Sequence, residues 1–314
     1  MKEIDCKAVA IITVTYNPEL DPLRAQLEHL PAESLKIIVD NASQPEVLQN
    51  ITALVSRMPT TRMLRNAKNL GLAAAVNLGV RAVREQAPQV RWVLLLDQDS
   101  EPHAGSIQNL VDSFNALELN GERVGCIGPL LLDAGTGLSY GFHQATRWRW
   151  RRAYPPVGST RPVACANING SGSLVPIDLF LQLGGLDESL FIDHIDTEWS
   201  FRVLAAGYGL WGIPSAVFTH RMGQTSVRFW MLGWHVWPSR TPQRHYFLFR
   251  NAVTLMRRPY VPPVWKSWAI VKLALTALVH GLFDPERRSQ WHYMWQGVRA
   301  GLSMCSAPPP GKPA

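Results

Sequence analysis

The chain has 314 residues, of which 46% are hydrophobic and 18% charged, a composition that indicates a packed globular protein and excludes a largely disordered one. Its formal net charge of +7 is compatible with nucleic acid, an anionic membrane surface or a phosphate-bearing substrate as a partner. The four cysteines show no CxxC spacing, and the short, β-branched apolar stretch near the N-terminus does not resemble a secretory signal. We therefore expect a cytoplasmic protein with free thiols.

Three runs of β-branched and aliphatic residues, each ending in a polar segment, occupy the first third of the chain. They cover residues 9–14, 36–39 and 92–96. Continuous apolar runs of this length are typical of strands buried on both faces of a parallel sheet. Four helical patterns and one further strand accompany them, the helices at 20–30, 46–57, 72–86 and 105–119 and the strand at 124–132. This alternation predicts an α/β fold, with helices on both faces of the sheet and right-handed crossovers.

The remainder of the chain is less regular. We expect a loop, a strand, a helix and an acidic segment that leads into a second helix, at residues 135–159, 166–176, 177–183 and 187–206. Eight of the twelve tryptophans follow residue 210, mixed with arginine, histidine and proline. We therefore predict a first domain over 1–225, a basic, Trp-rich helical region over 226–306 and a disordered tail over 307–314.

The segment 264–283 has the length of a membrane-spanning helix, but two lysines and a histidine interrupt it. A lysine near the centre of a spanning helix costs about 2.5–3.5 kcal/mol on insertion scales. Six apolar residues share one face at helical spacing: Val264, Trp268, Val271, Leu275, Leu278 and Leu282. This pattern favours a helix lying in the plane of a membrane surface over a span, and a helix packed on its own domain is the alternative.

Polar residues follow the predicted strands, and ligands collect at the carboxyl ends of strands in a parallel sheet. The candidates for nucleotide or sugar binding are Thr15, Tyr16, Asn17, Asp40, Asn41, Asn69, Gly71, Asn77 and Asp97. The carboxylate of Asp40 can accept the N3–H of a uracil or thymine ring, although an Asx turn would also explain it. Gly71 precedes small residues that let a helix N-terminus lie close to phosphate or sugar, although the same residues make an ordinary helix start.

A metal site is indicated by Asp97 and Asp99, which form an Asp-x-Asp pair directly after the third run. Paired carboxylate oxygens suit Mg²⁺ or Mn²⁺, which bridge to the phosphate oxygens of a nucleotide. Capping of the next helix by Asp99 and Ser100 is the alternative. His220 ends another apolar run and is either a third metal ligand or a structural hydrogen-bonding residue.

The acidic segment supplies candidate catalytic residues, namely Asp193, His194 and Asp196. Acidic residues stabilise the first turn of a helix through its dipole, which is the alternative explanation. Apolar neighbours, however, raise the pKa of a carboxyl group toward the range of a general base. In the C-terminal region, Arg244 and Arg250 suit the phosphates of an acceptor or of a bilayer.

Two common nucleotide-binding classes are disfavoured. The turn after the first run reads Thr-Tyr-Asn-Pro-Glu, so it lacks the G-x-G-x-x-G pattern of dinucleotide-binding enzymes. The chain also contains no G-x-x-x-x-G-K pattern, which argues against phosphoryl transfer by a P-loop.

Taken together, the order of these residues over about residues 8–258 resembles the nucleotide-sugar-dependent glycosyltransferases of family 2. Three stretches resemble signatures of the bacterial rhamnosyltransferases in that family, at 94–100, 190–199 and 244–251. The resemblance implies a GT-A, Rossmann-like sheet and an inverting transfer of L-rhamnose from dTDP-β-L-rhamnose with Mg²⁺ or Mn²⁺. It also implies that Asp40 reads the pyrimidine, that Asp99 holds the metal and that Asp97 lies nearer the ribose or the sugar.

The resemblance leaves the base open. Many members carry it in a Glu-Asp pair, where this chain has Asp193-His194, with Asp196 shortly after. We favour Asp193, which His194 could orient. Inversion requires one base opposite the leaving group, and a metal-bound nucleoside diphosphate departs without a general acid.

The expected acceptor is a hydroxyl of a lipid-linked glycan, as in O-antigen or capsule assembly, used by an enzyme bound peripherally to the inner face of the cytoplasmic membrane. A rhamnolipid acceptor is the alternative that keeps the same chemistry. A basic nucleic-acid-binding protein is the alternative from another class, but the basic residues follow no recognisable module and the acidic cluster would repel phosphate backbones. We therefore expect no nucleic-acid partner. The intact acidic residues also argue against a catalytically inactive sensor of sugar nucleotides.

Overall fold

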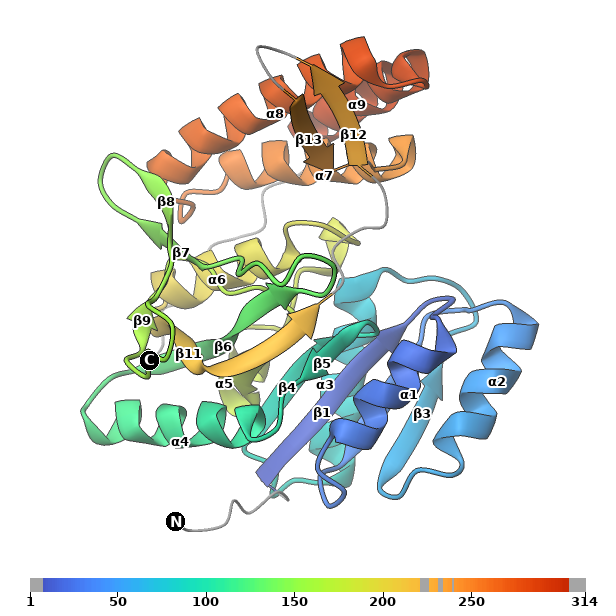
Figure 1. Cartoon of the computed structure of the whole chain (residues 1–314), viewed down its shortest axis with the longest axis vertical. Coiled ribbons are helices and arrows are strands. Elements are labelled where there is room, and N and C mark those ends of the chain that lie inside the picture. The colour runs from blue at the N-terminus through green and yellow to red at the C-terminus, as the bar shows by residue number, and fades with distance from the viewer. Residues whose placement is uncertain (1–7, 221–225, 231–233, 239, 305–314) are drawn as a thin grey trace.

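The structure, a computed structural model, describes residues 8–220, 226–230, 234–238 and 240–304. Its centre is a nine-stranded sheet in the order β3-β2-β1-β4-β10-β6-β11-β5, with β9 also paired to β11 (Figure 1). The first four strands in this order are parallel, namely β3 (Thr61–Arg65), β2 (Lys36–Asp40), β1 (Val9–Thr15) and β4 (Trp92–Asp97). These strands and their crossover helices confirm the predicted α/β fold.

The other half of the sheet is mixed. The strand β10 (Ser173–Pro176) runs antiparallel to β4 and to β6 (Val124–Asp133). The long strand β11 (Gly209–His220) is parallel to β6 and antiparallel to the short β5 (Ser100–Pro102) and β9 (Val163–Ala164). The pairing of β5 with β11 brings residue 220 beside residue 100, across a gap of 120 positions in the sequence.

Helices cover both faces of the sheet because alternate strand residues point to opposite sides and nearly all of them are apolar. One core contains Val9, Ile11 and Leu94 with side chains of α1 (Leu20–His29), α2 (Pro45–Val55) and α4 (Ser106–Leu119). The opposite core contains Ala10, Ile12 and Leu95 with side chains of α3 (Leu72–Gln86), α5 (Ile177–Gln182) and α6 (Ile195–Ala205). A short 3₁₀ turn, η2 (Glu188–Leu190), precedes α6.

Residues 135–159, expected to form a loop, contain the hairpin β7 (Phe142–Ala145) and β8 (Trp150–Ala153), so that prediction was wrong. Phe142 is buried, and the ring of Trp150 stacks on His143 and also contacts Phe201 of α6. The hairpin therefore buries only a few side chains, and the exposed arginines around them obscured the alternation in the sequence.

The C-terminal region holds a second hairpin, β12 (Ser226–Trp230) and β13 (Trp234–Pro238), followed by α7 (Pro242–Met256), α8 (Pro263–Phe283) and α9 (Arg287–Ser303). Figure 1 shows these helices as a layer beyond α6, at the top of the view. They share the core of the sheet, because Ala252, Leu255 and Trp265 belong to the same buried cluster as strand β1. The predicted boundary at residue 225 lies next to undescribed residues, and the predicted tail lies outside the described part of the chain.

Within the described residues, α8 is the helix long and apolar enough to cross a membrane, with a mean hydropathy of 1.2 and 28% of its most apolar window buried. Of the predicted apolar face, Trp268 turns inward and packs against the main core. The other end of that face is exposed: Val271, Leu275, Leu278 and Leu282. The predicted apolar face is therefore partly covered by the protein itself and partly exposed to solvent.

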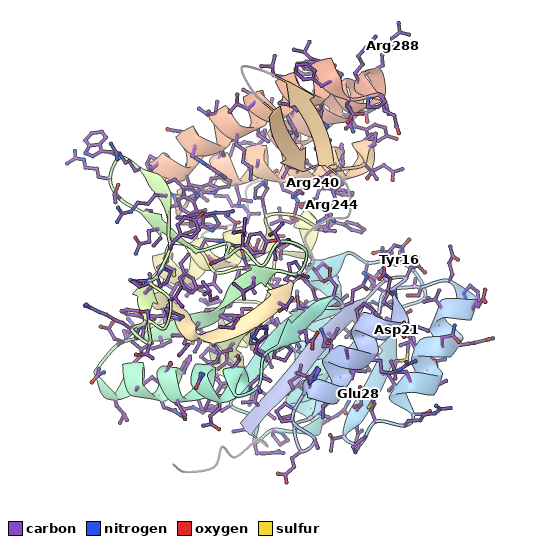
Figure 2. The ribbon with its side chains drawn as sticks, viewed as in Figure 1. Tyr16, Asp21, Glu28, Arg240, Arg244 and Arg288 are labelled. Carbon is purple, nitrogen blue, oxygen red and sulfur yellow. The ribbon has the colours of Figure 1, made fainter. Side chains whose placement is uncertain are left out.

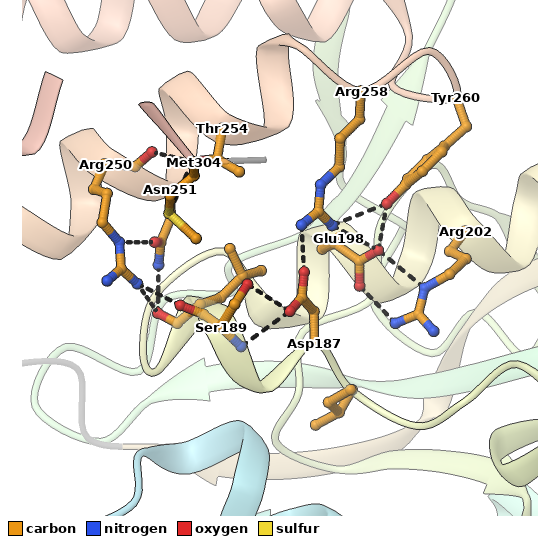
Figure 3. Close-up of polar contacts among 12 residues, drawn as sticks. Asp187, Ser189, Glu198, Arg202, Arg250, Asn251, Thr254, Arg258, Tyr260 and Met304 are labelled. Atoms are coloured by element: carbon orange, nitrogen blue, oxygen red, sulfur yellow. Dashed lines mark hydrogen bonds and ion pairs between the residues drawn. The ribbon is translucent and has the colours of Figure 1, made fainter. Parts of the chain in front are cut away.

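A buried ionic network attaches the C-terminal helices to α6 (Figure 3). Glu198, which is 1% exposed, accepts hydrogen bonds from Arg202 and from the hydroxyl of Tyr260, and it pairs with Arg258 at 3.0 Å. Arg258 also contacts Asp187 at the start of the acidic segment. Because both glutamate oxygens and the buried guanidinium have partners, the network holds α6 and the end of α7 together.

We expect Glu198→Ala to destabilise the protein by about 3–5 kcal/mol, because it leaves a buried arginine without its partner. Chemical denaturation followed by circular dichroism measures this change. The matched control is Glu118→Ala, which breaks the surface ion pair with Arg91 and should cost about 0–1 kcal/mol. Equal effects of the two substitutions would contradict the structural role assigned to the network.

Candidate active site at the carboxyl edge of the sheet

Strands β1, β2 and β4 end in register, so their terminal polar residues lie side by side. Thr15 pairs with Asp40, and Val14 pairs with Asp97. Asp40 is 1% exposed, and its carboxylate accepts hydrogen bonds from the hydroxyls of Thr15 and Ser43 and from the Ser43 backbone N–H. The side chain of Asp40 thus has a local structural role, through a backbone N–H three residues on, and reading of a pyrimidine by Asp40 stays a prediction.

Side-chain amides connect the loops at this edge. The Asn41 amide donates to Asn69 Oδ1 at 2.9 Å, and its own oxygen accepts from the Asn66 amide and the Leu70 N–H. Asn69 Oδ1 also accepts the N–H of Gly71 at the start of α3. Hydrogen bonds thus join the loop after β2 to the loop between β3 and α3.

The loop after β1 is tied to the loops after β2 and β4. Asn17 accepts the N–H of Gln44, and the Tyr16 N–H donates to the side chain of Gln98 at 2.8 Å. The side chain of Tyr16 is exposed, at 50%, and Figure 2 shows it on the surface near the end of β1. This placement leaves an aromatic ring free beside the amide-rich loops.

Two of the predicted donor-binding residues contact the acidic segment. The Asn77 amide donates to the carbonyl of Leu186 at 2.9 Å, and its oxygen accepts the Leu186 N–H at 2.8 Å. Gly71 has a φ of +86° and packs so closely on Phe191 that an added Cβ would lie 2.6 Å from that ring. Both residues position the acidic segment, and their contact with a donor stays a prediction.

The aspartate pair and His220 lie together, with ligand atoms from Asp97, Asp99 and His220 within 4.8 Å of one another. His220 Nδ1 is 2.7 Å from Ser100 Oγ and 3.5 Å from Asp99 Oδ1. All three side chains are partly exposed, so a ligand can reach them. Two carboxylates and an imidazole form a donor set that fits Mn²⁺ and, through its oxygens, Mg²⁺.

The turn that carries the aspartates is held by residues that the sequence analysis missed. Gln26 of α1 is fully buried and donates to the carbonyls of Asp97 and Ser100, at 2.7 and 2.5 Å. Ser171 Oγ accepts the Asp97 N–H and donates to Ser100 Oγ. A polar residue between Leu23 and Leu27 on a buried helix face was the available signal for Gln26.

The acidic segment has an unusual backbone. Phe191, Asp193 and His194 have φ values of 63°, 60° and 61°, a conformation that residues other than glycine rarely adopt. Such residues cost about 1–3 kcal/mol each, so the surrounding structure must impose the conformation. The strained residues include two of the three candidate bases.

The candidate bases differ in electrostatics. Burial raises the pKa of Asp193, but Arg240 and Arg244 outweigh it and hold the pKa below its ordinary value. Arg240 Nη1 lies 2.6 Å from Asp193 Oδ1, and Arg244 Nε lies 3.2 Å from Oδ2. Figure 2 shows both arginines below α7, on the side toward the sheet.

The pKa shifts of Asp196 and His194 favour the neutral form of each side chain, whereas the shift of Asp193 favours its charged form. Burial, with a further contribution from the charge of Asp97, raises the pKa of Asp196 to about 6. Burial lowers the pKa of His194 to about 4, and its ring packs edge-on against Trp265. A carboxyl group with a pKa raised in this way suits the role of a general base.

The arginines predicted to contact an acceptor have different surroundings. Arg244 is half-exposed beside Asp193. Arg250 donates to the carbonyls of Ser189 and Leu190, at 2.8 and 2.9 Å. Arg250 thus holds the acidic segment, and its contact with an acceptor stays a prediction.

The fold and this site define the class of protein. The chain superimposes on GalNAc-T7 with UDP, GalNAc and Mn²⁺ with a TM-score of 0.54 and 17% identity, covering 88% of this chain and 58% of that one. It superimposes on the mannosyltransferase PcManGT from Pyrobaculum calidifontis in complex with GDP-Man and Mn²⁺ with a TM-score of 0.54 and 15% identity, covering 94% and 87%. The sheet is therefore a GT-A sheet.

Sequence comparison specifies the family. Residues 10–130 match the model of glycosyl transferase family 2, so the chain carries a domain of that family. It is 28% identical to the dTDP-rhamnosyl transferase RfbF of Shigella flexneri, over 93% of both chains. It is 29% identical to the N-acetylglucosaminyl-diphospho-decaprenol L-rhamnosyltransferase of Mycobacterium tuberculosis, over 69% of this chain and 77% of the relative. The chain thus carries a glycosyl transferase family 2 domain and resembles bacterial rhamnosyltransferases.

The cluster of Asp97, Asp99 and His220 leads to a direct prediction. We expect Asp99→Asn and His220→Ala each to weaken Mn²⁺ binding by about tenfold or more, since even loss of a group behind a ligand commonly costs 10–100-fold. Electron paramagnetic resonance of free Mn²⁺ measures the affinity. Asp112→Asn on the exposed surface of α4 is the control, and unchanged affinity in all three variants would rule out this metal site.

Proposed function

We propose that the protein is a metal-dependent, inverting glycosyltransferase that moves L-rhamnose from dTDP-β-L-rhamnose to a hydroxyl of a lipid-linked glycan. The observation that carries the proposal is the cluster of Asp97, Asp99 and His220 at the carboxyl edge of the sheet, with Asp196 nearby. The names of the relatives support the donor and the acceptor class, since one is a dTDP-rhamnosyl transferase and the other acts on a decaprenol diphosphate.

In this proposal the donor lies along the loops after β1, β2 and β3. Thr15, Tyr16 and Asn17 face the nucleoside, and Asp40, Asn41 and Asn69 hold the base and ribose through the amide network. Mg²⁺ or Mn²⁺, held by Asp97, Asp99 and His220, would neutralise the departing diphosphate. The preformed hydrogen bonds among these loops support this arrangement, because little ordering would be required when the donor binds.

The base takes the proton of the acceptor hydroxyl as that oxygen attacks the anomeric carbon. Asp193, His194 and Asp196 remain the candidates, and the raised pKa of Asp196 favours that residue. A general base must accept a proton near the working pH, which suits a carboxyl group whose pKa is about 6. Both carboxylate oxygens of Asp193 contact arginines, which oppose protonation. Asp193 would then anchor Arg240 and Arg244 for an anionic acceptor.

We expect transfer from dTDP-rhamnose, among a panel of nucleotide sugars, in the presence of Mg²⁺ or Mn²⁺. Asp196→Asn should bind dTDP normally and lose transfer by about 10²–10⁴-fold, the usual contribution of a general base. The exposed Asp178→Asn on α5 is the control. Full turnover of Asp196→Asn with loss in Asp193→Asn or His194→Ala would reassign the base, and no sugar transfer from any donor would overturn the proposed function.

The pH dependence of transfer is a separate prediction. If Asp196 is the base, kcat should fall as the pH drops through about 6, because protonation removes the basic form of the carboxylate. A cation bound by Asp97 would move this acid-side fall in kcat to lower pH, since positive charge favours the ionised carboxylate. If kcat of Asp196→Asn falls at the same pH as that of the unaltered enzyme, the assignment of Asp196 as the base is contradicted. Stopped assays between pH 4 and 8 measure the profile.

We further propose that the enzyme is cytoplasmic and lies on the inner face of the cytoplasmic membrane through α8 and α9. The supporting observation is a set of exposed apolar side chains on these helices: Ile270, Val271, Leu275, Leu278, Leu282, Trp291 and Trp295. Tryptophan and leucine on an amphipathic helix favour burial at the headgroup level, and nearby Arg287 and Arg288 at the start of α9 favour anionic lipid.

Flotation with anionic liposomes tests this docking. We expect Leu278→Glu to reduce the bound fraction, because it places a charge in the apolar face of α8. Leu119→Glu on α4 is the matched control, since this leucine is 87% exposed on another surface. Failure of the unaltered protein to float, or an equal loss in both variants, would contradict the proposed membrane surface.

A further inference from the structure

The side chain of Asn251, in the middle of α7, is completely buried against the acidic segment. Its Nδ2 donates to the carbonyls of Leu190, Ile192 and Asp193, at 2.8, 2.6 and 2.9 Å. An amide nitrogen carries two hydrogens, so one hydrogen must be shared between two of the three carbonyls. A single side chain thus satisfies three backbone groups in the segment that carries the candidate bases.

Arg250 sets the orientation of this amide. Its Nε donates to Asn251 Oδ1 at 2.9 Å, and its Nη2 donates to the carbonyls of Ser189 and Leu190 (Figure 3). Because a guanidinium can only donate, the asparagine must present its oxygen to Arg250 and its NH₂ to the acidic segment. The Arg-Asn pair therefore acts as one unit.

The acidic segment depends on such external partners. Phe191, Asp193 and His194 all have positive φ, so no helix or strand ladder can satisfy the neighbouring carbonyls. On the opposite side, the Leu72 N–H donates to the Phe191 carbonyl at 2.6 Å, and Gly71 packs against the same residue. The segment is held between the start of α3 and the middle of α7.

We infer that Asn251 is a positioning residue for the sugar-transfer step, because it fixes the backbone of residues 190–193, directly before the helix α6 that carries Asp196. The inference rests on the proposed transferase function but not on the identity of the base. Asp193 and His194 lie at or directly after the carbonyls that Asn251 holds, and Asp196 follows three residues later in the first turn of α6. A displacement of about 1 Å in a reacting group can cost 10²-fold in rate, so a loss of these bonds should reduce kcat.

The experiment compares Asn251→Ala with Asn251→Ser. Both substitutions leave a similar cavity, but serine retains one hydroxyl donor for a carbonyl. We expect Asn251→Ala to lower kcat by about tenfold or more, with KM for dTDP-rhamnose and the Kd for dTDP with Mn²⁺ within about twofold of the unaltered enzyme. Asn251→Ser should retain more kcat than Asn251→Ala. Equal kcat in the two variants, or an unchanged kcat in both, would overturn the inference.

Arg257→Ala is the matched control on α7. The Arg257 guanidinium also contacts three carbonyls, those of Gly301, Leu302 and Met304, but these lie at the end of α9. The control should lower Tm without lowering kcat per dTDP-binding site. A loss of kcat equal to that of Asn251→Ala would mean that general destabilisation, and not positioning, explains the effect.

Hydrogen exchange gives a readout that does not require activity. We expect faster exchange of the amides in 189–194 in Asn251→Ala and unchanged exchange there in Arg257→Ala. Unchanged exchange of 189–194 in Asn251→Ala would overturn the positioning role. If the unaltered protein transfers no sugar while the exchange result holds, the proposed function fails and the structural part of the inference stands.

Discussion

Parallel strands that are buried on both faces meet solvent only at their ends, and the candidate site depends on this constraint. Because β1, β2 and β4 end in register, Thr15, Asp40 and Asp97 are side by side without any loop having to bring them together. Helices cover the rest of each strand, so its other residues are mostly apolar, with Thr13 and Lys36 as exceptions. The hydrogen bonds of Gln26 and Asn41 then convert a row of strand ends into a defined surface.

The second half of the site has a different physical basis. The acidic segment between α5 and α6 adopts a backbone that it would not adopt alone, and contacts from α3 and α7 impose it. Helix α7 therefore holds in place the segment that carries the candidate bases. The buried pairing of Arg258 with Asp187 and Glu198 keeps α7 in place for this role.

The sequence predicted β1, β2, β4, β6 and the four helices of the first 130 residues closely, because hydrophobic periodicity is strong where both faces of a sheet are buried. It missed β3, whose residues are only partly buried, and the three-residue strand β5. The helix predicted at 72–86 has those bounds in the structure. The hairpin at 142–153 was missed because Phe142 is the one residue of its two strands that is buried. Trp268 was placed on the same apolar face as Leu275 and Leu278 but, unlike them, packs against the main core, since periodicity defines an apolar face without showing which part of it is covered.

The amino-acid sequence by itself determined the βαβ series, the polar ends of its strands and the chemical types of the candidate ligands, since these follow from local pattern and residue chemistry. Only the tertiary structure decided that His220 lies beside Asp99, that Arg240 and Arg244 pair with Asp193, and that Asn251 holds the acidic segment. These contacts join residues 47 to 121 positions apart. The pKa values of the acidic groups follow from those contacts and from burial, and neither can be read from the order of residues alone.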